Sequence, residues 1–171
     1  MWLMQAVAVG ALLVTGVDAS AADKCAAAKL RGVAARESTV LRCLSTVAAK
    51  ADSSDLAACE AAAAGAFADA FSKAGVCQGT QGRCEQIADG CVAAVGGAFA
   101  DFFPSRCESV KRKAAATLAA KLLGCQAKAA KSGRAVKPSC QDKARRKFDG
   151  AMRRAGVCPD GGTPQPVLPK D

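Results

Sequence analysis

The chain has 171 residues, a formal net charge of +9 and ten cysteines, and it contains no histidine. Histidine is the usual general base, and no nucleophile elbow, phosphate loop or paired-carboxylate motif is present, so we expect no enzyme, no cofactor and no metal site. Hydrophobic residues make up 51% but most are alanine, and six phenylalanines make a thin core, so covalent cross-links are expected.

The N-terminal stretch predicts export. Residues 2–17 are an apolar run, and Ala19-Ser20-Ala21 is a small-x-small pattern typical of signal-peptide cleavage. We expect a signal peptide over 1–21 and a mature start near Ala22, with a buried N-terminal helix as the alternative. The run is short for a membrane span, so no transmembrane anchor is expected. Cysteine-rich chains belong to oxidising compartments, which predicts a secreted or periplasmic protein.

Residues 22–78 predict a first helical hairpin. The spacing Cys-x17-Cys occurs twice, at Cys25 with Cys43 and at Cys59 with Cys77. At about 3.6 residues per turn this spacing makes about five helical turns, so both cysteines of one helix lie on one stripe. Two such helices folded back on each other pair Cys25 with Cys77 and Cys43 with Cys59.

Residues 79–104 predict a flexible joint and a central helix. We expect this helix to pack against two stripes, Phe67 with Phe71 and Phe148 with Met152, and so to join the two hairpins. Its apolar face carries residues at helical spacing, which are Ile87, Cys91, Val95, Phe99 and Phe102.

Cys84 and Cys91 stand outside the hairpin pattern. Seven positions apart on a regular helix, they are roughly 10 Å from each other, too far for a disulfide. A local bridge, with Cys84 bent back from the preceding loop, is slightly favoured over buried thiols or links to a second chain. A thiol-redox protein using this pair is one alternative function.

Residues 105–158 repeat the cysteine pattern. Cys107 and Cys125 have the Cys-x17-Cys spacing, as do Cys140 and Cys158, which predicts the bridges Cys107–Cys158 and Cys125–Cys140. Ligands so far apart on separate helix ends do not converge on one zinc ion, so disulfides explain the cysteines better than a metal. Residues 159–171 are rich in proline and glycine and are expected to be disordered.

The second hairpin is strongly basic. Between Cys107 and Cys158 fourteen basic residues oppose three acidic ones, whereas the first hairpin is nearly neutral. A cationic face attracts polyanions such as nucleic acid, lipopolysaccharide, acidic glycans or anionic membranes. A plain solvated surface is the alternative. The candidate binding residues are Lys111, Arg112, Lys113, Lys143, Arg145, Arg146, Lys147, Arg153 and Arg154.

The repeat resembles a group of uncharacterised exported bacterial proteins rich in alanine, lysine and cysteine. Their repeats run Cys-x17-Cys, short loop, Cys-x17-Cys, and the resemblance covers 25–158. It rests on the cysteines and on short matching segments, which are Gln126-Ala127-Lys128-Ala129, Lys147-Phe148 and Gly156-Val157-Cys158. The resemblance implies a helical, disulfide-rich fold and carries no activity across. The stapled hairpin is also similar in architecture alone to the twin-cysteine hairpins of mitochondrial intermembrane-space proteins.

These patterns together predict an all-α protein with about five helices after the signal peptide. Two disulfide-stapled antiparallel hairpins are joined by a central helix. The expected role is a non-enzymatic structural or interaction module. Its partner would be an unknown protein or an anionic envelope or extracellular polymer, the latter bound through the second hairpin.

Overall fold

The computed structural model describes residues 23–77, 79–98 and 105–158, and these residues form helices without a strand. The predicted all-α class is therefore confirmed. The predicted signal peptide over 1–21, the tail over 159–171, and the aromatic residues Phe99 and Phe102 lie outside the described residues. The helices are α2 (Lys24–Lys50), α3 (Leu56–Ala74), α4 (Gln81–Gly97), α5 (Arg106–Ser132) and α6 (Pro138–Ala155).

Local side chains define the ends of the long helices. The Asp23 carboxylate accepts a hydrogen bond from the backbone N–H of Ala26 (2.8 Å) and caps α2. The Ser105 hydroxyl accepts one from the N–H of Glu108 (3.1 Å) and caps α5. The Glu108 carboxylate binds Arg112 rather than returning to the cap, so this is a simple serine cap and not a full capping box. Gly133, with φ of 61°, ends α5 in the left-handed conformation.

Each hairpin is held by an inner and an outer disulfide. The first hairpin contains Cys43–Cys59 and Cys25–Cys77, and their sequence separations are 16 and 52. The second contains Cys125–Cys140 and Cys107–Cys158, with separations of 15 and 51. These are the pairs that the Cys-x17-Cys spacing predicts. In the loop-entropy model the inner bridges stabilise by about 3 kcal/mol each and the outer ones by about 4 kcal/mol.

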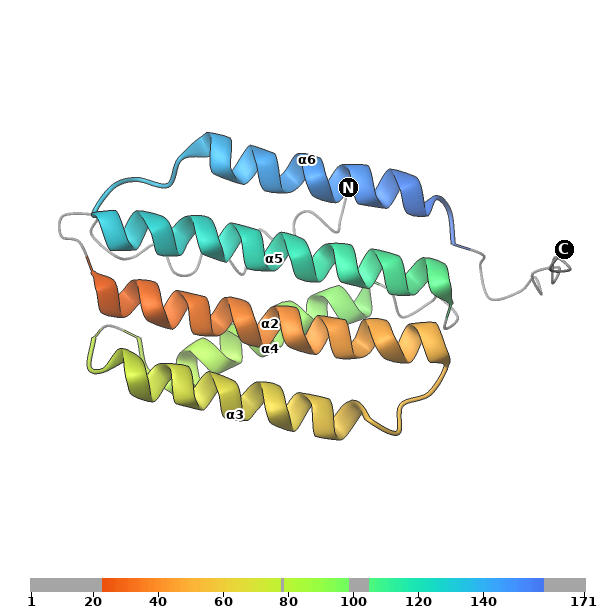
Figure 1. Cartoon of the computed structure of the whole chain (residues 1–171), viewed down its shortest axis with the longest axis horizontal. Helices are drawn as coiled ribbons and strands as arrows, with labels where there is room; N and C mark the ends of the chain where they lie inside the picture. Colours follow the sequence, from red (N-terminus) through yellow and green to blue (C-terminus); the bar gives the residue numbers. More distant parts are fainter. Residues whose placement is uncertain (1–22, 78, 99–104, 159–171) are drawn as a thin grey trace, which may run out of the picture.

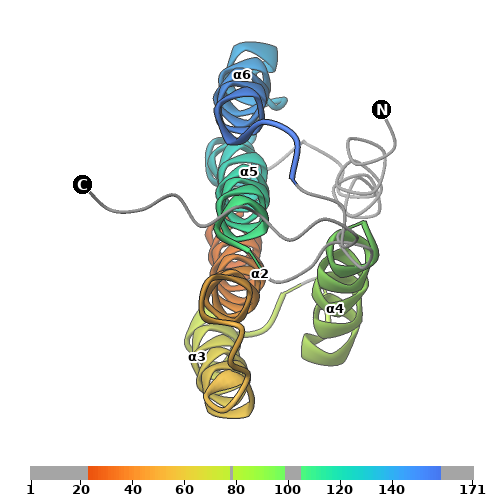
Figure 2. The ribbon, with the colours of Figure 1, turned by 90° about the vertical axis from the view of Figure 1, so that its right-hand side faces the viewer.

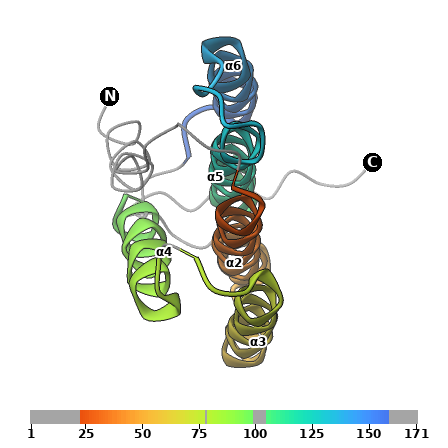
Figure 3. The same cartoon turned by 90° about the vertical axis from the view of Figure 1, so that its left-hand side faces the viewer.

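The four helices of the hairpins lie side by side in one layer, in the order α3, α2, α5, α6 (Figure 1). Helix α4 lies against one side of this layer, beside α2 (Figures 2 and 3). Among the described residues no helix lies on the opposite side of the layer, which we call the uncovered face and which is turned toward the viewer in Figure 1. The described helices thus form one layer of four with one covering helix.

The two hairpins meet directly through their long helices, α2 and α5, which run antiparallel. At one end the N–H of Asp23 donates to the carbonyl of Ala130 (2.9 Å), and at the other the Ser45 hydroxyl donates to the carbonyl of Ser109 (2.9 Å). Small buried side chains on both helices allow this close approach. They include Ala27, Ala34, Ser38 and Ser45 on α2 and Ala115, Ala116 and Ala119 on α5.

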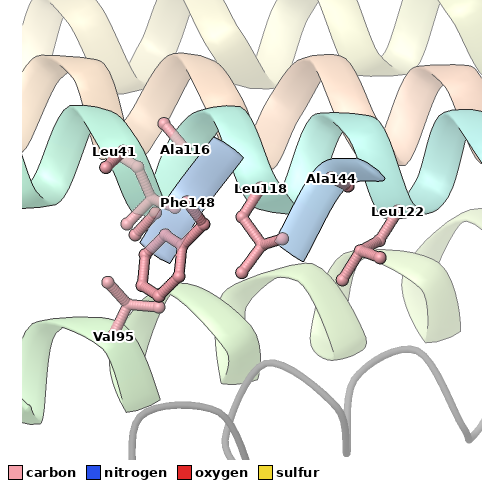
Figure 4. Close-up of a cluster of buried hydrophobic side chains, with 9 residues drawn as sticks. Leu41, Val95, Ala116, Leu118, Leu122, Ala144 and Phe148 are labelled. Atoms are coloured by element: carbon pink, nitrogen blue, oxygen red, sulfur yellow. The ribbon is translucent and has the colours of Figure 1, made fainter. Parts of the chain in front are cut away.

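Helix α4 packs over this junction and contacts both hairpins, as the sequence predicted. Val95 of α4 lies in the same buried cluster as Leu118 and Phe148 (Figure 4). Ala88 of α4 lies in a second cluster with Phe67, Phe71 and other residues. The helix therefore packs against both aromatic stripes, but the direct contact of α2 with α5 already joins the hairpins.

Candidate anion-binding face

The second hairpin does not gather its nine predicted cations on one face. Lys111, Arg112 and Lys113 are consecutive, and consecutive helix residues point about 100° apart. Arg112 is partly buried and its guanidinium pairs with the buried carboxylate of Glu108 at 2.6 Å. Lys111 is also partly buried, and only Lys113 is exposed. One cation of this cluster is thus available on the uncovered face.

Helix α6 divides its cations in the same way. Lys143, Lys147 and Arg154 are exposed and follow at i, i+4 and i+11, which is one stripe. This stripe and Phe148 flank the contact with α5 on opposite sides, and Phe148 packs beneath α4, so the stripe lies on the uncovered face. Three candidates fall elsewhere on the helix: Arg146 and Arg153 are exposed at the outer edge of the layer, and Arg145 is partly buried.

Helix α5 supplies cations that sequence reasoning missed. Every exposed charged side chain of this fully described helix is basic, namely Arg106, Lys113, Lys121, Lys128 and Lys131. Its one acidic residue, Glu108, is only 3% exposed and is engaged by Arg112. Arg106, Lys113 and Lys131 are spaced by about two and five helical turns and lie half a turn around from the side that meets α4. That periodicity is the signal that would have identified them.

A shallow hollow opens between α5 and α6 at one end of this surface. Its volume is about 350 Å³, and its lining combines two arginines with apolar side chains. Arg106 and Arg154 supply the positive charge, while Val110, Ala151 and Ala155 supply apolar surface. Val110 is 42% exposed. The hollow therefore combines two guanidinium groups with apolar side chains in its lining.

The acidic side chains of α4 are occupied on the other side of the layer. Arg36 of α2 forms ion pairs with Glu85 and Asp89, both at 2.9 Å. The same guanidinium lies over the ring of Phe67, 5.3 Å from its centroid. These contacts hold α4 against α2. They also leave the two carboxylates on the covered side, away from the exposed cations.

Cys84 and Cys91 are free thiols within α4. The favoured local bridge is wrong, because the helix already begins at Gln81 and Cys84 does not bend back from a loop. A regular helix keeps positions seven apart at roughly 10 Å. Of the alternatives, the buried thiol describes Cys91, which is 6% exposed, while Cys84 is partly buried.

The surroundings of both thiols favour the protonated form. Burial, together with the nearby Glu37 carboxyl, raises the pKa of Cys91 to about 12. Burial also raises the pKa of Cys84, although Lys29 and Arg83 oppose that shift. Reactive cysteines need a depressed pKa and access to solvent, so neither thiol has the setting of a redox nucleophile.

Two charged residues of α2, Lys29 and Glu37, are buried. The Lys29 ammonium donates to the carbonyls of Cys77 (3.0 Å) and Gly79 (2.8 Å), which fixes the connection leading into α4. Glu37 is 4% exposed, and burial raises the pKa of its carboxyl to about 8. Both residues therefore have structural surroundings rather than access to a ligand.

The described residues bring one group of potential metal ligands together, Asp23 with Cys25 and Cys77. The two sulfurs form a disulfide and so have no thiolate to offer a metal. In the described part of the chain, none of the helices has the length and apolar character needed to cross a membrane. Comparisons with protein-family models, with curated proteins and with solved structures find no match to this chain.

Proposed function

We propose that this protein is a non-enzymatic interaction module that binds polyanions through the exposed cations of its second hairpin. One observation carries the proposal: every exposed charge on α5 is basic, while the only acid of that helix is buried and ion-paired. A face without carboxylates attracts anions more strongly than a mixed surface of the same net charge.

Covalent staples suit such a role. Four disulfides hold the helices of both hairpins, so the cations project from a scaffold with little freedom to rearrange. Binding then costs little ordering entropy on the protein side. Disulfides are typical of oxidising compartments, and we propose a secreted or periplasmic location after removal of residues 1–21. The candidate ligands are anionic glycans, lipopolysaccharide and nucleic acid.

The test is binding to immobilised heparin as a function of salt. A triple variant, Lys113→Gln, Lys143→Gln and Lys147→Gln, removes three cations of the second hairpin. The control, Lys50→Gln, Lys73→Gln and Arg83→Gln, removes three exposed cations elsewhere. Glutamine is a good helix former, so both variants should fold.

We expect wild type to bind with a steep salt dependence, and each lost contact to lower the slope of log K against log salt by about one. The second-hairpin variant should elute at clearly lower salt than the control. Equal elution of the two variants, or no retention of wild type at low salt, would refute the proposal.

A further inference from the structure

The basic surface continues from the second hairpin onto the first. The exposed charged side chains of α2 are all basic, and its one acid, Glu37, is buried. Lys24, Arg31 and Arg42 are spaced by about two and three helical turns and so lie on one stripe. Arg36 and Glu37 lie on the side of α2 that faces α4. The stripe lies on the opposite side of the helix and therefore belongs to the uncovered face.

Three adjacent helices thus present cations on one flat side. Helices α2, α5 and α6 are neighbours in the layer, and the layer is nearly planar in end view (Figures 2 and 3). Asp149 of α6 lies about 160° around the helix from Lys147, and the exposed Asp142 lies about 100° from Lys143, at the outer edge of the layer with Arg146 and Arg153. The residues that form this plane are Lys24, Arg31, Arg42, Arg106, Lys113, Lys131, Lys143, Lys147 and Arg154.

The spacing of these cations favours a planar ligand over a thread-like one. At about 1.5 Å per residue, neighbouring cations on one helix lie roughly 10 to 27 Å apart, except Lys143 and Lys147, which lie roughly 6 Å apart. Apart from that pair the distances exceed a Debye length at physiological salt, so a linear chain that follows one helix would interact with only one or two cations at a time. A flat anionic surface would contact the cations of all three helices together.

The hollow between α5 and α6 adds a chemical preference. Arg106 and Arg154 can bind a phosphate group through paired N–H donors, and the apolar residues that line the hollow with them suit apolar groups attached to that phosphate. In a sulfated or phosphorylated sugar polymer hydroxyl groups surround the anion, whereas in a phospholipid apolar acyl chains follow a few bonds from the phosphate.

From the plane and the hollow we infer that the uncovered face lies flat on the headgroups of an anionic lipid bilayer, with a lipid phosphate held between Arg106 and Arg154. This inference rests on the proposed anion binding and specifies its ligand. It also adds the cations of α2, which the proposed function does not require.

The experiment measures binding of the full chain to vesicles that contain phosphatidylglycerol and phosphatidylcholine. Vesicles of phosphatidylcholine alone measure any contribution of the apolar stretch 2–17. The test variant carries Lys24→Gln, Arg31→Gln and Arg42→Gln. The control again carries Lys50→Gln, Lys73→Gln and Arg83→Gln, which removes the same charge away from the plane. Circular dichroism and thermal unfolding confirm that both variants fold.

We expect wild type to bind the anionic vesicles and the α2 variant to bind about 100-fold more weakly, since each cation near such a surface contributes about 1 kcal/mol. The control should stay within a fewfold of wild type. A double variant, Arg106→Gln and Arg154→Gln, should lose about tenfold or more, whereas Arg146→Gln with Arg153→Gln at the outer edge should lose less.

Two results would overturn the inference. One is equal vesicle binding by the α2 variant and its control, and the other is no preference of wild type for anionic over neutral vesicles. Heparin retention that depends on the second hairpin alone would then leave the proposed function standing. Loss of both heparin and vesicle binding in wild type would remove both.

Discussion

The two hairpins share one construction and differ in surface. Each pairs a 27-residue inner helix with a shorter outer helix through two disulfides. Yet the outer helix of the first, α3, exposes mainly small side chains such as Ala57, Ala61 and Ala66, while that of the second, α6, exposes lysine and arginine. When bridges fix the packing, the outer side chains are free to differ. The comparison separates what holds the fold from what acts on other molecules.

The largest expected effect tests whether the outer bridges are equivalent. Cys25→Ser with Cys77→Ser, and Cys107→Ser with Cys158→Ser, open loops of nearly equal length, because the sequence separations are 52 and 51. Each pair should lower the free energy of unfolding by about 4 kcal/mol, measured by urea denaturation. Cys84→Ser removes a thiol without a bridge and is the control. Because loops of equal length predict equal losses, a difference of more than about 2 kcal/mol between the hairpins would show that they are not held alike.

A second test concerns the buried acids of the inner helices. Glu108 of α5 is paired with Arg112, whereas among the described residues no cation pairs with Glu37 of α2, and burial raises the pKa of Glu37 from 4.5 to about 8. The folded state therefore holds this proton more tightly than the unfolded chain. The contribution of the protonated Glu37 carboxyl to the free energy of unfolding is complete below about pH 4.5 and is lost as pH rises through about 8.

The raised pKa of Glu37 predicts that the free energy of unfolding of wild type falls by about 3 kcal/mol between about pH 5 and pH 7. The slope is at most about 1.4 kcal/mol per pH unit. Glu37→Gln should flatten that part of the profile and be more stable than wild type near neutral pH. Urea titrations across the range measure it, with Glu60→Gln on the exposed side of α3 as control. A profile for Glu37→Gln that still falls like wild type would contradict the prediction.

The smallest effect concerns the close approach of α2 and α3. A Cβ added at Gly32 would lie 3.1 Å from the Cβ of Ala70, so α3 must yield by a few tenths of an ångström. Alanine favours the helix over glycine by about 1 kcal/mol, which opposes that cost. In the second hairpin Ala114 and Ala151 pack at the corresponding place.

We therefore expect Gly32→Ala to raise the free energy of unfolding by less than about 1 kcal/mol. The shift in the midpoint of urea denaturation measures this change. Gly65→Ala, on the open side of α3 where an added Cβ meets nothing, measures the helix preference alone. If α3 could not shift, overpacking at Gly32 would cost more than the helix preference returns, so a loss above about 2 kcal/mol at Gly32 alone would mean that the first hairpin tolerates less at its seam than the second.

The sequence predicted the hairpins and their pairing because the Cys-x17-Cys spacing places both cysteines of a helix on one stripe. It did not predict the direct contact of α2 with α5, because buried alanines and serines are common on any alanine-rich helix and do not indicate which neighbour they meet. Nor does the sequence alone indicate that Lys29 and Glu37 are buried, because burial depends on neighbours distant along the chain, such as the carbonyls of Cys77 and Gly79 that accept from Lys29.

The basic face was located only in part for a related reason. A net charge sums over all sides of a helix, so the near-neutral count of the first hairpin concealed the stripe of Lys24, Arg31 and Arg42. Conversely, the run Lys111 to Lys113 looked like one cluster but divides among three directions. Placing each charge needed the positions of the neighbouring helices as well as the helical period.

Because one disulfide of each hairpin lies inside the loop closed by the other, the fold can survive proteolytic cleavage in its turns. A cut in the turn at 51–55 leaves its two fragments joined by Cys43–Cys59 and again by Cys25–Cys77. A cut at 133–137 is held in the same way by the bridges of the second hairpin. Only cleavage between Cys77 and Cys107 separates the chain into two covalent halves, and the buried surface between α2 and α5 would then keep those halves associated. A nicked molecule would thus retain its shape and its array of cations.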